Sequence, residues 1–338
     1  MRVLIIAEAG VNHNGDMQMA KQLIDVAKQS GADIVKFQTA VPELVMTLNA
    51  PKAKYQMDLT GEQESQLEMA KKIHLPLSAF AELKRYAEQE VGIPFISTPF
   101  DEVSIDALHQ IGMELYKIPS GEVTNLPYLR KIAGFRKPVI LSTGMASLGE
   151  IEAAINVLMA AGLDKDQISI LHCNTQYPTP FEDVNLRAML TLKSAFGLKV
   201  GYSDHTLGIE VPVAAVAMGA EIIEKHFTLD KNLSGPDHKA SLSPEELMNM
   251  VQSIRNIEQA LGSAQKVASP SETPNKVVAR RSIHLRRDMK TGEKITWEDL
   301  IMKRPGDGIS PMQIELVVGK QIHADLPMDY KLTWSDFS

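Results

Sequence analysis

The sequence predicts an α/β protein: a (β/α)8 TIM barrel followed by a small, mostly β domain. Three observations lead to this prediction. Short apolar runs alternate with helix-like segments eight times between residues 3 and 261, and such serial βα units favour a closed parallel sheet. The apolar runs end in polar clusters, as barrel strands do at their carboxyl ends. The chain has 338 residues, which suits a barrel of roughly 250 residues with an added module.

The predicted strands are short runs rich in branched apolar residues. In chain order they cover residues 3–7, 34–38, 95–98, 115–118, 138–142, 168–172, 199–203 and 222–226. Amphipathic stretches between them, such as residues 17–29, 151–161 and 211–220, predict the crossover helices. A polar insertion over residues 42–74 predicts a loop with a short helix.

The domain boundaries follow from a change in composition after the predicted helix at residues 245–261. We assign residues 1–264 to the barrel. A Ser-, Pro- and Gly-rich stretch marks a linker, which we place at residues 265–279. Residues 280–338 carry short β-like runs and Gly-containing turns but little helical pattern, so they form the second domain.

Composition excludes several classes of protein. The chain is 44% hydrophobic and 23% charged, as is typical of a globular protein. The net charge is -7 and no long run of Lys and Arg occurs, so we expect no nucleic-acid partner. The apolar run at the N-terminus is too short for a signal peptide or a membrane span, so we expect a cytoplasmic protein. Cys173 is the one cysteine, which excludes an intrachain disulfide.

Two histidines each close a predicted strand. His205 ends the run that starts at residue 199, and His226 ends the run that starts at residue 222. Neutral imidazoles suit Mn, Fe, Co or Zn. A pair without a nearby cysteine leaves coordination positions for water and substrate, which suits catalysis better than a structural role. One strand-end histidine alone is usually a hydrogen-bonding residue, but the pair predicts a metal site.

Lysines and hydroxyls form a second set of polar residues at strand ends. Barrel interiors are normally filled with branched apolar side chains, so ionic groups there require a reason. The set would cradle a phosphate and a carboxylate, because such ligands need point charges and several donors. Its members are Lys36, Thr98, Lys117, Ser120, Ser142 and Ser203.

Ten motifs resemble those of the bacterial sialic acid synthases, in the same order and over nearly the whole chain. That family includes the synthases of N-acetylneuraminic, legionaminic and pseudaminic acids, and residues 280–338 resemble its antifreeze-like (SAF) domain. The motifs are EAGVNHNG (8–15), VKFQ (35–38), FISTPFD (95–101), YKIPSGE (116–122), LSTGM (141–145), CNTQYPTP (173–180), GYSDHT (201–206), EKHFTLD (224–230), GPDH (235–238) and KRPGDGIS (303–310).

The resemblance implies a transferase that condenses phosphoenolpyruvate with an open-chain N-acetylated amino sugar. Carbon 3 of phosphoenolpyruvate attacks the sugar aldehyde, water adds at carbon 2, and phosphate leaves with C–O cleavage. A divalent metal, most often Mn²⁺ with Mg²⁺ or Co²⁺ as alternatives, would sit on His205 and His226 and act as a Lewis acid. We expect an enzyme of the N-acetylneuraminate synthase type that uses N-acetylmannosamine or a 2,4-diacetamido analogue, with an N,N'-diacetyllegionaminate or pseudaminate synthase as the alternative.

The resemblance also implies roles for individual residues. The lysine and hydroxyl set above would hold phosphoenolpyruvate, completed by one residue of the pair Asn174 and Thr175. Glu122 would stabilise the cation or handle the proton of water. Arg304, from the small domain, would reach the N-acetyl group in the partner's barrel, which implies a domain-swapped homodimer. The residues that face the sugar or metal-bound water would be Glu8, Gln38, Tyr177 and Asp237.

Alternatives remain open at this point. Lys117 is also placed to act as the Schiff-base lysine of a class I aldolase without a metal. An inert sugar-binding or ice-binding barrel is suggested by the antifreeze-like tail alone, but unpaired buried charges are costly in a barrel that performs no chemistry. Asp237 in a Gly-Pro-Asp-His sequence suits a turn, and Arg304 suits a solvated loop. No motif decides which acceptor sugar is used.

Overall fold

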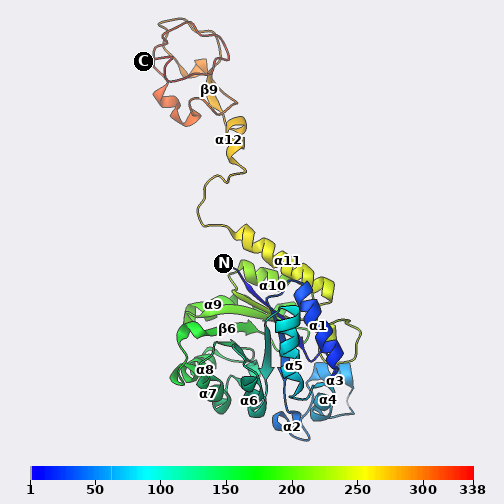
Figure 1. Cartoon of the computed structure of the whole chain (residues 1–338). Coiled ribbons are helices and arrows are strands. Elements are labelled where there is room, and N and C mark those ends of the chain that lie inside the picture. The colour runs from blue at the N-terminus through cyan, green and yellow to red at the C-terminus, as the bar shows by residue number, and fades with distance from the viewer. Residues whose placement is uncertain (1, 62) are drawn as a thin grey trace. The chain divides into compact units, whose positions relative to one another are not determined.

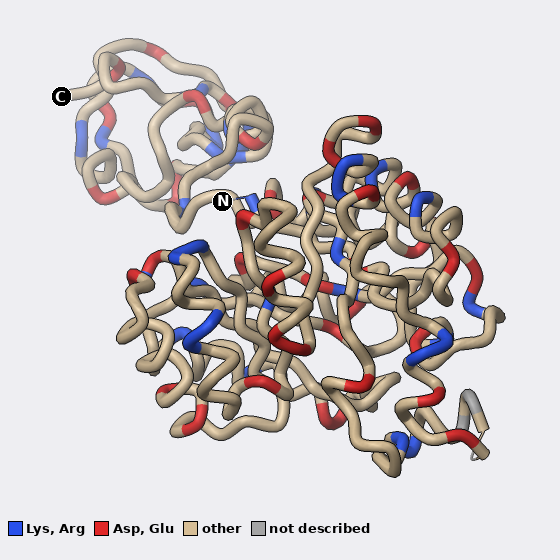
Figure 2. Tube along the Cα trace, turned by 60° about the horizontal axis from the view of Figure 1, so that its bottom comes forward, with Lys and Arg blue, Asp and Glu red and all other residues tan. Residues whose placement is uncertain are grey.

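The chain divides into two compact units between Gly262 and Ser263, and each is described by itself. The structure is a computed structural model, and it describes residues 2–61 and 63–338. The first unit contains a sheet surrounded by helices (Figure 1). Basic and acidic residues are interspersed over both units (Figure 2). None of the helices in the described part of the chain is long and apolar enough to span a bilayer.

The first unit confirms the predicted (β/α)8 barrel. Its eight strands form one parallel sheet in the order β3-β2-β1-β8-β7-β6-β5-β4, and β3 and β4 lie next to each other, which closes the sheet. Each strand overlaps a predicted run. The strands are β1 (Leu4–Gly10), β2 (Ile34–Thr39), β3 (Phe95–Pro99), β4 (Tyr116–Ile118), β5 (Val139–Ser142), β6 (Ile168–Cys173), β7 (Lys199–Asp204) and β8 (Ile222–His226).

Several helices of the barrel begin at side-chain caps that the sequence provides. Asp16 accepts hydrogen bonds from the amides of Gln18 and Met19 at the start of the first helix, and Ser147 and Ser243 form capping boxes with a glutamate three residues later. The crossover helices are α1 (Met17–Gln29), α5 (Ala79–Arg85), α6 (Glu102–Gln110), α7 (Leu126–Gly134), α8 (Leu148–Ala160), α9 (Arg187–Phe196), α10 (Glu210–Ala217) and α11 (Pro244–Leu261).

The insertion between β2 and β3 is more helical than predicted. It contains α2 (Pro42–Val45), α3 (Lys54–Thr60) and α4 (Gln66–Ile73) ahead of α5. The capping box of Ser65 and Glu68 starts α4, and Leu67, Met69 and Ala70 form its buried face. The polar composition of the insertion concealed this short apolar face; α4 contacts α2 of the same insertion.

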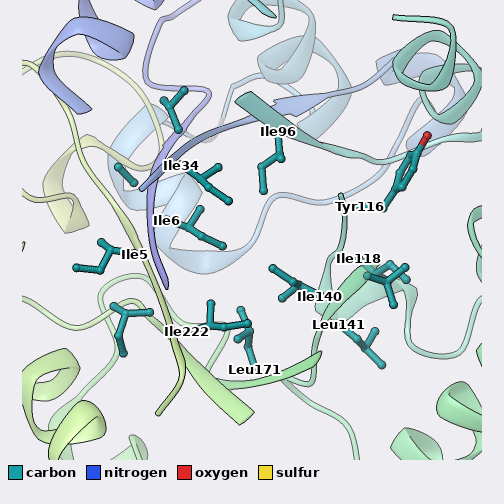
Figure 3. Packing of buried hydrophobic residues seen from close by; sticks show 14 of the residues in the cluster. Ile5, Ile6, Ile34, Ile96, Tyr116, Ile118, Ile140, Leu141, Leu171 and Ile222 are labelled. Atoms are coloured by element: carbon teal, nitrogen blue, oxygen red, sulfur yellow. The ribbon is translucent and has the colours of Figure 1, made fainter. Parts of the chain in front are cut away.

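Alternation along the strands stacks a polar layer on an apolar one inside the barrel. Successive side chains of a strand point to opposite faces, so Ile6 and Glu8 share the inner face of β1, as Ile222 and His226 share that of β8. Branched side chains such as Ile6, Ile34, Ile96, Ile140, Leu171 and Ile222 fill the interior (Figure 3). Glu8 lies opposite Lys36 on β2 and His226 on β8. The charged layer therefore lies at the carboxyl ends of the strands.

The second unit has its own core and a small antiparallel sheet. Strands β9 (Ser282–Leu285) and β10 (Leu300–Lys303) pair, and short 3-10 turns and isolated bridges complete the unit. Its buried side chains include Ile283, Leu285 and Val317. One helix, α12 (Thr273–Ala279), lies inside the stretch predicted as linker; a proline in its first turn suits a helix start.

Candidate active site

A cavity of about 170 Å³ opens at the carboxyl ends of the barrel strands. Eleven of the residues singled out from the sequence line it, although they come from seven strands or the loops that follow them. This is where active sites of such barrels are built. The eleven are Glu8, Lys36, Gln38, Thr98, Lys117, Ser120, Ser142, Thr175, Tyr177, Ser203 and His205.

Two buried lysines form the cationic part of this cavity. Lys36 Nζ donates to Glu8 Oε1 at 2.5 Å and to Thr98 Oγ1 at 3.1 Å. Lys117 Nζ donates to Ser142 Oγ at 2.7 Å. The exposed fractions of the two lysine side chains are only 2% and 4%. Two desolvated cations with hydroxyl neighbours offer the fixed donors that a phosphate or carboxylate requires.

Glu224 belongs to this cluster and was missed in the sequence. Its Oε1 lies 3.4 Å from Lys117 Nζ and 3.7 Å from Lys36 Nζ, and it accepts a hydrogen bond from Ser203 Oγ at 3.0 Å. Its Oε2 is buried and has no hydrogen-bond partner within the described residues. The signal was present, because a residue two positions before His226 on a strand must share its face.

The two strand-end histidines lie close together beside this cluster. The centroids of the His205 and His226 rings are 5.8 Å apart. His205 Nε2 lies 2.9 Å from the Tyr177 hydroxyl, and its Nδ1 contacts the carbonyl of Asn174. His226 Nε2 lies 3.3 Å from Glu8 Oε2. Within the part of the chain that the structure describes, the buried Nδ1 of His226 has no partner.

The electrostatics favour a neutral His205 and a charged Glu8. Burial, together with the neighbouring His226, lowers the pKa of His205 to about 3. Burial raises the pKa of Glu8, but His226 and Lys36 outweigh it and hold that pKa well below its usual range. No group of three or more His, Cys, Asp or Glu among the described residues is arranged to hold a metal ion. Two neighbouring imidazoles, of which that of His226 has an unpartnered nitrogen, nevertheless fit a divalent ion that completes its coordination with water and substrate.

A second cavity, of about 250 Å³, adjoins the first. The two share Gln38, Phe100 and Tyr177. Asp237 lines this second cavity, and burial raises the pKa of its carboxyl. Tyr55, from α3, stacks on Tyr177 with ring centroids 5.3 Å apart. We call this second cavity the insertion chamber, because residues of α2, α3 and α4 form much of its wall.

The remaining candidates lie outside the first cavity. The amide of Asn174 is engaged in its own loop, where Oδ1 accepts from the amide of Gln176 at 2.7 Å, whereas Thr175 lines the cavity. Glu122 follows the lining residues Ser120 and Gly121, but its carboxylate accepts a hydrogen bond from Asn125 at 2.5 Å. Burial raises the pKa of Glu122.

Arg304 lies in the second unit, where it is exposed and its Nε donates to the carbonyl of Ala279 at 3.0 Å. That hydrogen bond leaves the other guanidinium nitrogens of Arg304 available as donors.

A buried ion pair flanks both histidines in the sequence. Lys225 Nζ pairs with the Asp204 carboxylate and donates to the carbonyl of Thr206 at 2.7 Å. Asp204 in turn accepts from the amide and hydroxyl of Thr206. Since Asp204 and Thr206 stand on either side of His205, and Lys225 precedes His226, this pair ties the end of β7 to the end of β8.

Buried lysines, hydroxyls and an imidazole thus line the barrel mouth, where enzymes of this fold carry their active sites. Two family models agree with this view: the NeuB family matches residues 23–266, and the SAF domain matches residues 280–338. The chain belongs to the NeuB family, as its motifs indicated.

Individual relatives support the assignment. The chain is 54% identical to N,N'-diacetyllegionaminic acid synthase of Campylobacter jejuni, over 94% of this chain and 95% of that protein. It is 49% identical to the N,N'-diacetyllegionaminic acid synthase of Legionella pneumophila, over 99% and 94% of the two chains. The crystal structure of N-acetylneuraminic acid synthetase from Leptospira borgpetersenii, a citrate complex, superposes with a TM-score of 0.70 at 37% identity, over 81% of this chain and 90% of that one.

Proposed function

We propose that this enzyme condenses phosphoenolpyruvate with a 2,4-diacetamido-2,4,6-trideoxyhexose to form N,N'-diacetyllegionaminic acid and phosphate. Identities of 54% and 49% to two enzymes of that name support this acceptor. The expectation of N-acetylneuraminate synthesis is supported less well, since the sialic acid synthetase structure shares 37% identity. The alternative stated from the sequence therefore becomes our leading proposal.

The observation that carries the proposal is the position of the anion cradle beside the imidazoles. Lys36 and Lys117, with the hydroxyls of Thr98, Ser142 and Ser203, would hold the phosphate and carboxylate of phosphoenolpyruvate. Bound there, the enol pyruvate would lie against the side of the cavity that carries His205. A divalent metal, Mn²⁺ or alternatively Mg²⁺ or Co²⁺, held by His205 and His226 would polarise the sugar aldehyde.

The bonds formed and broken are those that the family resemblance implies. Carbon 3 of phosphoenolpyruvate bonds to carbon 1 of the sugar, the aldehyde oxygen takes up a proton and becomes a hydroxyl, and water adds to the oxocarbenium-like carbon 2 with loss of a proton. The C–O bond to phosphate breaks, so the bridging oxygen leaves with phosphate. Glu122, whose pKa is raised by burial, remains our candidate to stabilise the cation or receive the proton of water. Gln38, Tyr177 and Asp237 would orient the sugar.

Assembly and location complete the proposal. We propose a homodimer in which Arg304 of one chain binds the N-acetyl group in the barrel of the other, because the guanidinium can donate several hydrogen bonds to a neutral amide. A closed two-fold arrangement would give two equivalent sites. Phosphoenolpyruvate is a cytoplasmic metabolite, so we place the reaction in the cytoplasm.

The test is a phosphate-release assay with phosphoenolpyruvate and each candidate sugar. The proposal expects phosphate release with the 2,4-diacetamido sugar, a nonulosonic acid product, and loss of turnover in EDTA that added Mn²⁺ restores. A class I aldolase would instead keep its activity in EDTA, and borohydride would reduce the Schiff base between pyruvate and Lys117 to a stable adduct. If phosphate is released with neither sugar, the proposed condensation is refuted.

A further inference from the structure

We infer that the insertion chamber holds the 4-acetamido and 6-methyl end of the acceptor, and that its apolar wall selects this sugar over N-acetylmannosamine. The inference rests on the proposed function, because it assumes that the sugar aldehyde lies at the first cavity. It goes further by assigning specificity to the insertion between β2 and β3, a segment without any of the site residues picked out from the sequence.

The geometry links the chamber to the first cavity. The two cavities adjoin at Gln38, Phe100 and Tyr177, which line both. Tyr177 also contacts His205 at the first cavity and Tyr55 at the chamber. A sugar whose carbon 1 lies beside the imidazoles would therefore place carbons 4 to 6 in the chamber.

Part of the chamber wall on the side of the insertion is apolar. Val45 and Met46 come from the end of α2, and Met69, Ala70 and Ile73 come from α4. Met69 and Ala70 are buried, and the capping box at Ser65 fixes where their helix begins. The wall is thus built from folded helices rather than from a loose loop.

Polar groups are placed where an amide would need them. Asp237 lines the chamber near the shared residues, and the side-chain amides of Gln56 and Gln66 line it on the insertion side. Gln56 Oε1 accepts from the backbone amide of Ala53 at 3.0 Å and lies 3.4 Å from Gln66 Nε2, which holds the two side-chain amides together at the start of α3. Such a pair suits a second acetamido group, which offers both a donor and an acceptor.

The two acceptors differ in what they would present to this wall. The 2,4-diacetamido-trideoxy sugar presents a methyl at carbon 6 and an acetyl methyl at carbon 4, and both gain from apolar contact. N-acetylmannosamine presents hydroxyls at the same carbons, and these would lose water without finding partners on the apolar side. An apolar pocket lowers kcat/KM for a substrate with an added hydroxyl by only about 100-fold. We therefore expect kcat/KM to favour the diacetamido sugar by about that factor.

Two matched pairs of variants test the wall. Met46→Gln adds a polar amide with little change in length, and Met46→Leu keeps the position apolar. Ile73→Thr and Ile73→Val have nearly the same shape but differ by a hydroxyl. For each variant, kcat/KM is measured with both sugars at saturating phosphoenolpyruvate, together with the KM for phosphoenolpyruvate and the circular dichroism spectrum.

The inference expects Met46→Gln and Ile73→Thr to lower the preference for the diacetamido sugar by about tenfold or more, with the KM for phosphoenolpyruvate unchanged. The apolar partners, Met46→Leu and Ile73→Val, should keep the wild-type preference. If the wild type prefers the diacetamido sugar but both polar variants keep that preference while folded, the chamber does not select the acceptor, although the proposed function stands. If the wild type condenses neither sugar, the proposed function and this inference both fail.

Discussion

Replacing Lys225 by methionine should destabilise the barrel while leaving the second unit unaffected. The exposed fractions of the Lys225 and Asp204 side chains are 1% and 0%, so the substitution leaves a fully buried carboxylate without its counter-charge. It also removes the donor to the carbonyl of Thr206. Methionine fills most of the volume of the lysine stem, so lost packing contributes little.

The expected magnitude follows from the burial. Breaking a buried ion pair by removing one partner costs about 3–5 kcal/mol. With a urea m-value of about 3 kcal/mol per M, as expected at the upper end for a unit of this size, the unfolding midpoint should fall by about 1 to 2 M. The double variant Lys225→Met/Asp204→Asn should recover much of the loss, because the amide keeps an acceptor for Thr206 and no unpaired charge remains.

The chain offers an internal control for this measurement. Both tryptophans, Trp297 and Trp334, lie in the second unit, so fluorescence follows the unfolding of that unit. Far-UV circular dichroism is dominated by the barrel helices. Urea titrations of the full chain should therefore show a shifted dichroism transition and an unchanged fluorescence transition.

Two results would refute the reasoning. If Lys225→Met lowers the free energy of unfolding by less than about 1 kcal/mol, the pair contributes no more than an exposed ion pair does. A double variant that is no more stable than the single one would mean that packing, and not the unpaired charge, caused the loss.

Four further predictions follow from the site and the buried histidines. His226→Ala should abolish Mn²⁺ binding in calorimetry and turnover in the assay while the dichroism spectrum is retained; turnover in Mn²⁺-supplemented buffer would contradict the metal assignment. Lys117→Ala should weaken phosphoenolpyruvate binding by about 10- to 100-fold, because a charged hydrogen bond is worth about 1.5–3 kcal/mol, and unchanged affinity would argue against the cradle. Burial and the nearby His74 lower the pKa of His13 to about 4. Below pH ~6.5 the unfolded chain therefore binds more protons at this position than the native state does. The free energy of unfolding should consequently be about 2 kcal/mol lower at pH 5 than at pH 8. His13→Asn should reduce this loss and the exposed control His323→Asn should not; equal pH profiles would be inconsistent with a buried neutral His13. Mixing Arg304→Ala chains with His226→Ala chains should restore turnover if heterodimers form. If heterodimers form without turnover, the second unit of each chain serves the barrel of its own chain.

Local patterns were sufficient for most of the candidate site. Lys36, Lys117 and His205 each stand at or near the end of an apolar run, so their placement at the barrel mouth followed from strand geometry. Glu224 was not predicted, although the alternation along β8 places it on the same face as His226. Between Asn174 and Thr175 the sequence left the choice open, and only the loop conformation brings Thr175 to the cavity.

By itself the sequence determined the number and order of the βα units, the polar layer at their ends and the resemblance to a family, because these depend on short-range alternation and on motif order. The tertiary structure decided which charges meet. Lys36 and Glu224 are distant in the chain, and their 3.7 Å approach depends on the register of the closed sheet. The insertion chamber depends likewise on where α2 and α4 pack. Hydrogen-bonded register and packing are non-local, so a linear pattern specifies which residues face inward but not which of them come into contact.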